Sequence, residues 1–225
     1  MAMNKTKGLA AIFDLDRTLI DINSGWLYAR YERRHKRISL WQLGESLFWL
    51  GLYHLSLTDI EEAYRRAVRY YKGIPEKEMR ERVEEFFTHE VAHRLIPDAM
   101  AKVNDHRRKG HRIVMATNAS AMQASLAAET WGFDDWLANS FPTDKDGRLL
   151  GTLTSPLCYS HGKLARVKEW SQQHHISLSR SYFYSDSHSD LPLLLAVGHP
   201  RVVNPDPRLK RFCQKKGWKY LQWCR

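Results

Sequence analysis

Cysteine is scarce in this chain of 225 residues. The three cysteines (Cys158, Cys213 and Cys224) are too few and too far apart for a disulfide framework or a four-cysteine zinc site. We therefore expect free thiols in a reducing compartment, which favours a cytoplasmic protein.

Long hydrophobic runs are also missing. The chain starts with a short apolar run, Leu9–Phe13, that leads directly into carboxylates, which is not the pattern of a signal peptide. The most apolar longer stretch, residues 39–57, is interrupted by Gln42, Glu45 and His54. It is therefore not expected to span a membrane.

Acidic residues are outnumbered, since 25 Asp and Glu against 35 Lys and Arg give a net charge of +10. Much of the excess lies in residues 201–225, where Asp206 is the single acid. A basic balance suits nucleic acid, an anionic membrane or a phosphorylated small molecule. The hydrophobic share of 43% and charged share of 27% are ordinary for a globular protein, which excludes global disorder.

Three short apolar runs each end in polar residues able to do chemistry. They are Leu9–Phe13 before Asp14, Arg112–Ala116 before Thr117, and Tyr182–Tyr184 before Ser185 and Asp186. Runs of this length followed by turn formers and helical patterns are typical of buried strands in a parallel sheet. Because ligands bind beyond the carboxyl ends of such strands, we expect the polar residues to meet at one site.

Helical patterns separate these runs, at Asp98–Lys109, Ala119–Trp131 and Lys163–His175, and residues 143–154 predict a hairpin. Residues 21–95 contain only helical patterns, among them Ile60–Lys72 and Glu76–His89. The sequence therefore predicts an α/β fold, a three-layer Rossmann-like parallel sheet. Its core comprises residues 1–20 and 96–225, with an all-helical cap, residues 21–95, inserted after the first strand.

Asp14 and Asp16 follow the first apolar run directly. Two carboxylates held together at the end of a buried strand repel each other unless a cation offsets their charge. A hard divalent ion such as Mg²⁺, which prefers oxygen ligands, meets this need. The alternative is that Asp16 caps a turn or helix that begins at Arg17.

Further candidate side chains follow the other two runs. Asp186 and Asp190 lie in one short acidic segment, which is otherwise a solvated turn. Thr117 and Asn118 offer a hydroxyl and a main-chain N–H to an anion near a helix N-terminus. Lys163 offers a compact cation to a phosphate, or else lies on the surface.

The order of these residues resembles the four-motif signature of the haloacid dehalogenase-like hydrolases, in the phosphoserine-phosphatase-like branch. The matching segments are IFDLDRTL (12–19), IVMATN (113–118), HGK (161–163) and YSDSHSDLPLL (184–194). The resemblance covers about residues 8–205. It implies a phosphatase, that is, a hydrolase of phosphate monoesters, with a small helical cap.

The resemblance also implies a role for each motif residue. Asp14 is the expected nucleophile, which forms an aspartyl-phosphate, and Asp16 the general acid and then the base. Thr117, Asn118 and Lys163 are expected to bind the substrate phosphate.

Mg²⁺ is the cofactor that the resemblance implies. Its expected ligands are Asp14, the main-chain carbonyl of Asp16 and Asp186, with Asp190 assisting. Such a site suits phosphoryl transfer, where catalysis is mostly positioning and charge neutralisation.

Three positions depart from the family pattern. Arg17 and Asn118 stand where many relatives have glycine. Asn23 stands where phosphoserine phosphatases carry a substrate-binding glutamate, and Asp21 is the nearest acid. This departure argues against phosphoserine as the substrate.

The expected partner is a small phosphorylated substrate, soluble or amphiphilic. A lipid phosphate at an anionic membrane surface is the alternative, because Trp41–Leu55 is rich in aromatic residues and leucine and follows the basic run Arg30–Arg37. A buried seam between two cap helices is the preferred interpretation of the same stretch.

A catalytically silent nucleic-acid-binding protein is a second alternative. It rests on the basic end of the chain, where Trp218, Tyr220 and Trp223 could stack on bases. Because every catalytic position is filled, no nucleic-acid partner is expected. His89 and His93 have a spacing that places two rings on one helix face, but they are expected to be surface residues rather than metal ligands.

Overall fold

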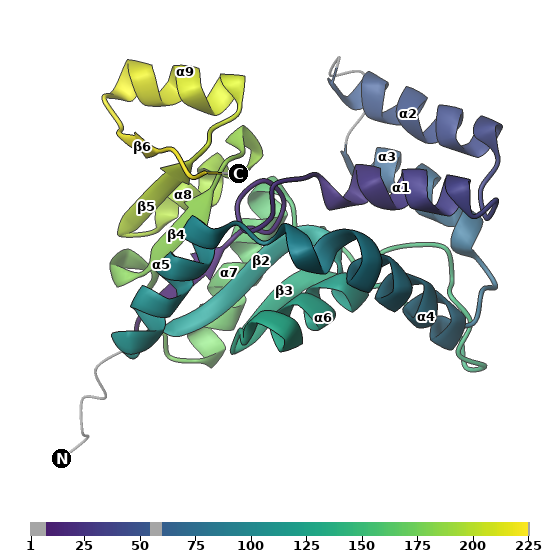
Figure 1. Cartoon of the computed structure of the whole chain (residues 1–225), viewed down its shortest axis with the longest axis horizontal. Coiled ribbons are helices and arrows are strands. Elements are labelled where there is room, and N and C mark those ends of the chain that lie inside the picture. The colour runs from purple at the N-terminus through teal and green to yellow at the C-terminus, as the bar shows by residue number, and fades with distance from the viewer. Residues whose placement is uncertain (1–7, 55–59, 225) are drawn as a thin grey trace.

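The computed structural model describes residues 8–54 and 60–224, and in these residues six parallel strands form one sheet. The strand order is β3-β2-β1-β4-β5-β6 (Figure 1). The strands are β1 (Ala10–Phe13), β2 (Arg112–Ser120), β3 (Asp135–Asn139), β4 (Tyr182–Ser185), β5 (His199–Val203) and β6 (Tyr220–Leu221). The predicted parallel α/β fold is confirmed.

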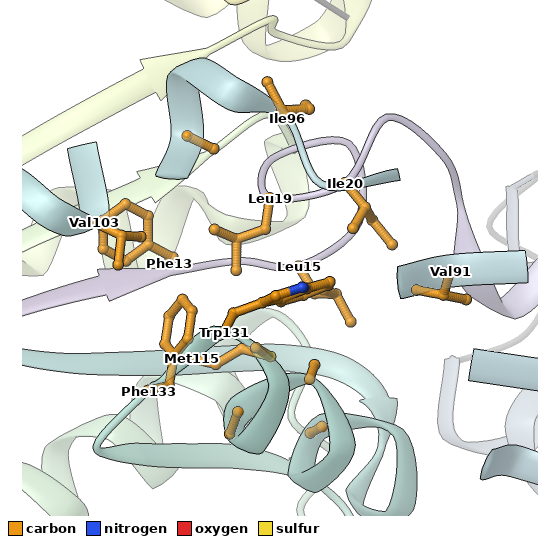
Figure 2. Packing of buried hydrophobic residues seen from close by; sticks show 14 of the residues in the cluster. Phe13, Leu15, Leu19, Ile20, Val91, Ile96, Val103, Met115, Trp131 and Phe133 are labelled. Carbon is orange, nitrogen blue, oxygen red and sulfur yellow. The ribbon is translucent and has the colours of Figure 1, made fainter. Parts of the chain in front are cut away.

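Helices cover both faces of the sheet. They are α5 (Pro97–Arg108) and α6 (Ala121–Trp131) on one face, with α7 (Ser160–Gln173), α8 (Leu191–Ala196) and α9 (Pro207–Lys216) on the other. Strand β1 is buried on both sides, since Ala11 and Phe13 pack in the first cluster and Ala10 and Ile12 in the second. Figure 2 shows Phe13 among the residues of the first cluster.

Local signals set the ends of these helices. The Ser120 hydroxyl accepts a hydrogen bond from the main-chain N–H of Gln123 and caps α6, which ends at Gly132 with a positive φ of 71°. Asp206 caps α9 in the same way, through the N–H of Leu209, and Pro207 is the first helical residue. The boundaries of α5, α6 and α7 are close to those that the sequence predicts, whereas α9 was not predicted.

The described part of the segment between β1 and β2 contains helices joined by turns and isolated bridges, and no strand, as the sequence predicts. It contains α1 (Ser24–Arg34), α2 (Leu40–His54), α3 (Ile60–Val68), a 3₁₀ turn (Arg69–Tyr71), α4 (Glu76–Phe86), a π turn (Phe87–Val91) and a second 3₁₀ turn (Ala92–Arg94). Figure 1 shows α1 to α4 together beside the sheet. The division into a cap of residues 21–95 and a core remains a prediction.

The basic end of the chain forms β5, α9 and β6, and the two strands belong to the sheet. Trp223 is buried, and its ring stacks on Tyr184 with ring centroids 5.8 Å apart. Trp218 meets Phe212 edge to face at 5.6 Å. Two of the three rings that could stack on bases therefore pack within the protein, which removes the main support for the nucleic-acid alternative.

Two other sequence interpretations change. The predicted hairpin of residues 143–154 is a short turn with one antiparallel bridge, Thr143 to Leu149, rather than two strands. The buried-seam interpretation is wrong for one face of α2, where Trp41 and Phe48 are exposed. Residue Leu55, at the end of that stretch, lies outside the described residues. No helix of the described part is long and apolar enough to cross a membrane.

Candidate active site

The carboxyl ends of β1 and β4 bring the first and last motifs together. Because β1 and β4 are parallel neighbours, Asp14 and Asp186 follow their strands at the same edge of the sheet. The main-chain N–H of Asp14 donates to the carbonyl of Tyr184 at 3.0 Å, so the pairing continues to the site itself.

Lys163, in the first turn of α7, joins the two acidic motifs. Its Nζ lies 2.8 Å from Asp14 Oδ1 and 2.7 Å from Asp190 Oδ1, and its side chain is only 3% exposed. The Ser185 hydroxyl donates to Asp190 Oδ2 at 2.7 Å and so holds the second carboxylate in place. Burial opposes the charge on Lys163, but the carboxylates of Asp14 and Asp190 outweigh it and raise the pKa of the ammonium. The lysine is therefore a buried cation and not a surface residue.

Gly162, just before Lys163, lies against the main chain of Leu157. A Cβ at position 162 would lie 2.1 Å from the carbonyl oxygen of Leu157, far inside contact distance. Only glycine fits there, which gives the Gly-Lys pair a steric reason.

Thr18 and Asp206 fix the loop that carries Asp186, and neither was a candidate from the sequence. Thr18 Oγ1 accepts a hydrogen bond from the Asp186 N–H at 3.1 Å and donates to Asp186 Oδ1 at 3.4 Å. Asp206 donates its N–H to the Asp186 carbonyl at 2.8 Å and accepts from the N–H of His188 at 2.7 Å. Thr18 lies in the first matching segment, IFDLDRTL, and Asp206 precedes a proline as a helix cap often does, so both carried a local signal.

Burial and mutual repulsion raise the pKa values of the acids. Burial is the main cause at Asp186, where the negative charges of Asp14 and Asp190 add to it and raise the pKa to about 8. Burial also raises the pKa of Asp14, against the opposing effect of Lys163. One ammonium thus serves more carboxylates than it can neutralise, which is the electrostatic setting of a cation site.

Asp16 lies at the junction with α1. Its Oδ1 accepts a hydrogen bond from the N–H of Ser24, the first residue of α1, at 3.0 Å. Burial raises the pKa of Asp16, so the carboxyl holds its proton more readily than a free aspartic acid. The next residue, Arg17, has a positive φ of 57° and is exposed.

Thr117 and Asn118 lie near the end of β2. Thr117 is buried, and its Oγ1 accepts from the N–H of Ala119 at 3.1 Å. The Asn118 amide donates to the hydroxyl of Tyr64 in α3, and its Oδ1 accepts from Asn139 Nδ2 at 3.0 Å. The Asn118 side chain is therefore held between the helical insert and the sheet, and its predicted phosphate contact remains a prediction.

A cavity of about 560 Å³ opens beside Asp186. Its lining comes from the loop after β1, from α1 and the turn before it, and from the start of α9, and includes Arg17, Trp26, Arg30 and Pro207. Asn23 also lines it, but its Oδ1 accepts the N–H of Trp26 at 2.9 Å and caps α1. The cavity gives a substrate group room next to the carboxylates.

Comparison with known proteins points to one family. The model of the haloacid dehalogenase-like hydrolases matches residues 11–195. A histidinol-phosphatase of Neisseria meningitidis is 25% identical over 217 residues, 95% of this chain and 98% of that protein. A phosphoserine phosphatase of Mycobacterium tuberculosis is 25% identical over 214 residues, 93% of this chain and 69% of that protein.

Solved structures agree in fold. A protein of unknown function from Bordetella pertussis Tohama I superimposes with a TM-score of 0.86 and 27% identity, covering 96% of this chain and 99% of that one. A phosphoserine phosphatase, solved as an analogue of its phospho-aspartyl intermediate, has a TM-score of 0.68 and 18% identity, with coverage of 96% and 93%. At that identity the likeness concerns the fold.

Proposed function

This chain belongs to the haloacid dehalogenase-like hydrolase family, and we propose that it is a Mg²⁺-dependent phosphomonoesterase that works through a phosphorylated Asp14. The phosphatase names of the relatives that it matches over most of its length agree with this activity. One observation carries the proposal. The buried Lys163 ammonium lies between the Asp14 and Asp190 carboxylates. Asp186, which follows the strand next to that of Asp14, lines a cavity.

The donor set suits Mg²⁺. Asp14, the main-chain carbonyl of Asp16 and Asp186 would supply hard oxygen ligands. Burial, with the charges of Asp14 and Asp190, raises the pKa of Asp186, and a bound cation would favour its ionised form. Among the described residues no three His, Cys, Asp or Glu side chains form a metal cluster. Mg²⁺ needs no such cluster, because it keeps several waters and binds through one or two carboxylates and the substrate phosphate. When bound, it neutralises charge on the phosphoryl oxygens.

Asp14 and Asp16 divide the reaction into two steps. A carboxylate oxygen of Asp14 attacks phosphorus, while the bond from phosphorus to the alcohol oxygen breaks and Asp16 donates a proton to that oxygen. Asp16 then takes a proton from water, whose oxygen attacks the phosphorus. This releases inorganic phosphate and frees Asp14.

Lys163 holds Asp14 and balances charge during both steps. Its contact at 2.8 Å orients the attacking carboxylate. The same ammonium stabilises negative charge that collects on the phosphoryl group, and in a buried site this effect is strong. Asp190 and Ser185 position the lysine rather than react.

The cavity sets the preference for the leaving alcohol. An ammonium group on that alcohol needs a carboxylate partner, and Asn23 offers an amide that is already used to cap α1. Asp21 lines the same cavity, but its Oδ1 lies 3.7 Å from Arg94 Nη1, which competes for it. An unpaired buried ammonium costs about 1–3 kcal/mol, so phosphoserine should have a kcat/KM roughly tenfold or more below that of an uncharged ester. A panel with phosphoserine, histidinol phosphate and apolar esters measures this. Histidinol phosphate also carries an ammonium group, so either of these two amines as the best substrate contradicts the argument.

Replacing the nucleophile tests the mechanism. Asp14→Asn should lower kcat for p-nitrophenyl phosphate by about 10⁴-fold or more, because a group that forms the covalent intermediate is lost. Asp146→Asn changes an exposed aspartate in a surface turn and serves as the matched control, with unchanged kcat. Near-wild-type turnover in a folded Asp14→Asn protein would overturn the assignment.

A further inference from the structure

Helix α2 presents an apolar face to solvent. Leu40 and Trp41 are each 68% exposed, Phe48 is 60% exposed and Leu47 is 43% exposed. With the exposed Gly44, these positions recur at steps of three and four residues and so share one side of the helix. A cluster of four large exposed apolar side chains on one helix face is typical of an interaction surface.

The other side of α2 packs on the helical insert. The guanidinium of Arg66 in α3 lies 4.7 Å from the centroid of the Trp49 ring, and Arg69 Nη2 lies 2.8 Å from Glu45 Oε2. The exposed face is therefore the side of α2 that points away from α3, and it consists of apolar residues and glycine.

A basic surface lies on α9 and the turn after it. Six exposed cations make it up, and in the described part of the chain none of them has an ion pair: Arg208, Lys210, Arg211, Lys215, Lys216 and Lys219. The acid of this segment, Asp206, accepts hydrogen bonds from the main-chain N–H groups of Leu209 and His188. The surface thus carries uncompensated positive charge.

The two helices that carry these surfaces lie along one edge of the molecule. In Figure 1, which looks down the shortest axis, α2 and α9 both lie along the upper edge, on either side of the loop after β1. The cavity is lined from both sides, by Trp26 and Arg30 of α1 and by Pro207 of α9. A partner that touched both α2 and α9 would therefore contact the two parts of the chain that flank the cavity.

We propose that the apolar face of α2 and the basic surface of α9 form a docking surface for an anionic lipid bilayer. Tryptophan, phenylalanine and leucine on a helix face insert at the boundary between head groups and acyl chains, and Lys and Arg attract anionic lipids. A second copy of the chain is the weaker candidate, because each copy carries a net charge of +10 and α9, which with the turn after it bears the six exposed cations, lies along the same edge as α2. Docking does not depend on the catalytic mechanism proposed above.

Vesicle binding by the full chain tests the proposal. We expect co-sedimentation with phosphatidylcholine vesicles that contain phosphatidylglycerol, weaker binding to phosphatidylcholine alone, and weaker binding at high salt, because ions screen the cationic surface. Trp41→Ser with Phe48→Ser should reduce the partition coefficient by about tenfold or more, since each ring gains by leaving water. Trp136→Ser, at an exposed tryptophan of β3, is the matched control and should bind like the wild type.

Charge reversal and activity complete the test. Lys215→Glu with Lys216→Glu should weaken binding to the anionic vesicles and leave binding to the neutral ones unchanged. All these variants should hydrolyse p-nitrophenyl phosphate like the wild type, so a wild-type protein that lacks this activity refutes the proposed function and leaves the docking result standing. Equal binding by the Trp41 and Phe48 variant and the wild type overturns the docking proposal. The proposal is also overturned if the wild-type protein is a dimer that does not bind vesicles and the variant with both substitutions is a monomer.

Discussion

Replacing Lys163 by methionine removes the charge at the centre of the site while keeping a side chain of similar length. The ammonium has two carboxylate contacts, at 2.8 Å to Asp14 and 2.7 Å to Asp190, and is 3% exposed. Removing one partner of a buried ion pair leaves an uncompensated charge and costs about 3–5 kcal/mol. We expect the free energy of unfolding of Lys163→Met, measured with urea in Mg²⁺-free buffer, to fall by about that amount.

The same change should affect catalysis. Loss of one buried group that stabilises transition-state charge typically costs about 10²–10³ in kcat. The destabilisation should be smaller at pH 5 than at pH 8, because without the ammonium Asp14 retains its proton more readily and a neutral acid is easier to bury.

Two further substitutions make the result specific. Lys168→Met, on an exposed position of the same helix, should change the free energy of unfolding by no more than about 0.5 kcal/mol. Lys163→Arg keeps the charge but not the compact shape, so it should retain more stability than activity. A Lys163→Met protein with wild-type stability and wild-type kcat would refute the reasoning from the buried contacts.

Three other outcomes are expected. Asp16→Asn should lower kcat by about 10²–10⁴-fold. If hydrolysis of the phosphorylated Asp14 is slowed more than its formation, stopped-flow measurement should show an initial burst of released alcohol. An unchanged rate would make Asp16 a structural cap. Because the folded-state pKa of Asp186 is raised to about 8, the folded chain holds a proton that the unfolded chain loses near pH 4, so stability without metal falls as pH rises between these values. Mg²⁺ should therefore raise the Tm more at pH 8 than at pH 5, and equal shifts would contradict this. Burial lowers the pKa of His106 from 6.5 to about 4, because the folded protein favours the neutral ring. The stability that the neutral ring contributes, at most about 3 kcal/mol, is complete above pH 6.5 and is lost as pH falls towards 4. The difference in unfolding free energy between wild type and His106→Gln should shrink over that range.

The sequence was informative where a signal is local. Short apolar runs that end in carboxylates predicted β1, β2 and β4, because a strand buried on both faces has almost no polar residues. Strand β3 begins with Asp135 and ends with Asn139, and β5 contains Pro200, so their mixed composition hid them. They are strands because neighbouring strands supply their hydrogen-bond partners.

The candidate site followed the same rule. Two local patterns identified the acids: the close spacing of Asp14 and Asp16, and the motif that contains Asp186. Their positions after parallel strands predicted that these acids lie at one site. The contacts of Thr18 and Asp206 with the Asp186 loop, and of Asn118 with Tyr64, join residues from different elements. No pattern within a short window encodes such pairs.

The sequence by itself determined the alternation of strands and helices, the helical insert after the first strand, and the chemical groups at the strand ends. Only the tertiary structure decided that Lys163 is buried between two carboxylates, that Trp223 packs on Tyr184, and that one face of α2 stays uncovered. The physical reason is that hydrophobic periodicity states which side chains should leave water. Which partner covers them depends on contacts between residues far apart in the chain. The apolar pattern of α2 therefore favoured a buried seam but could not show that one face stays exposed.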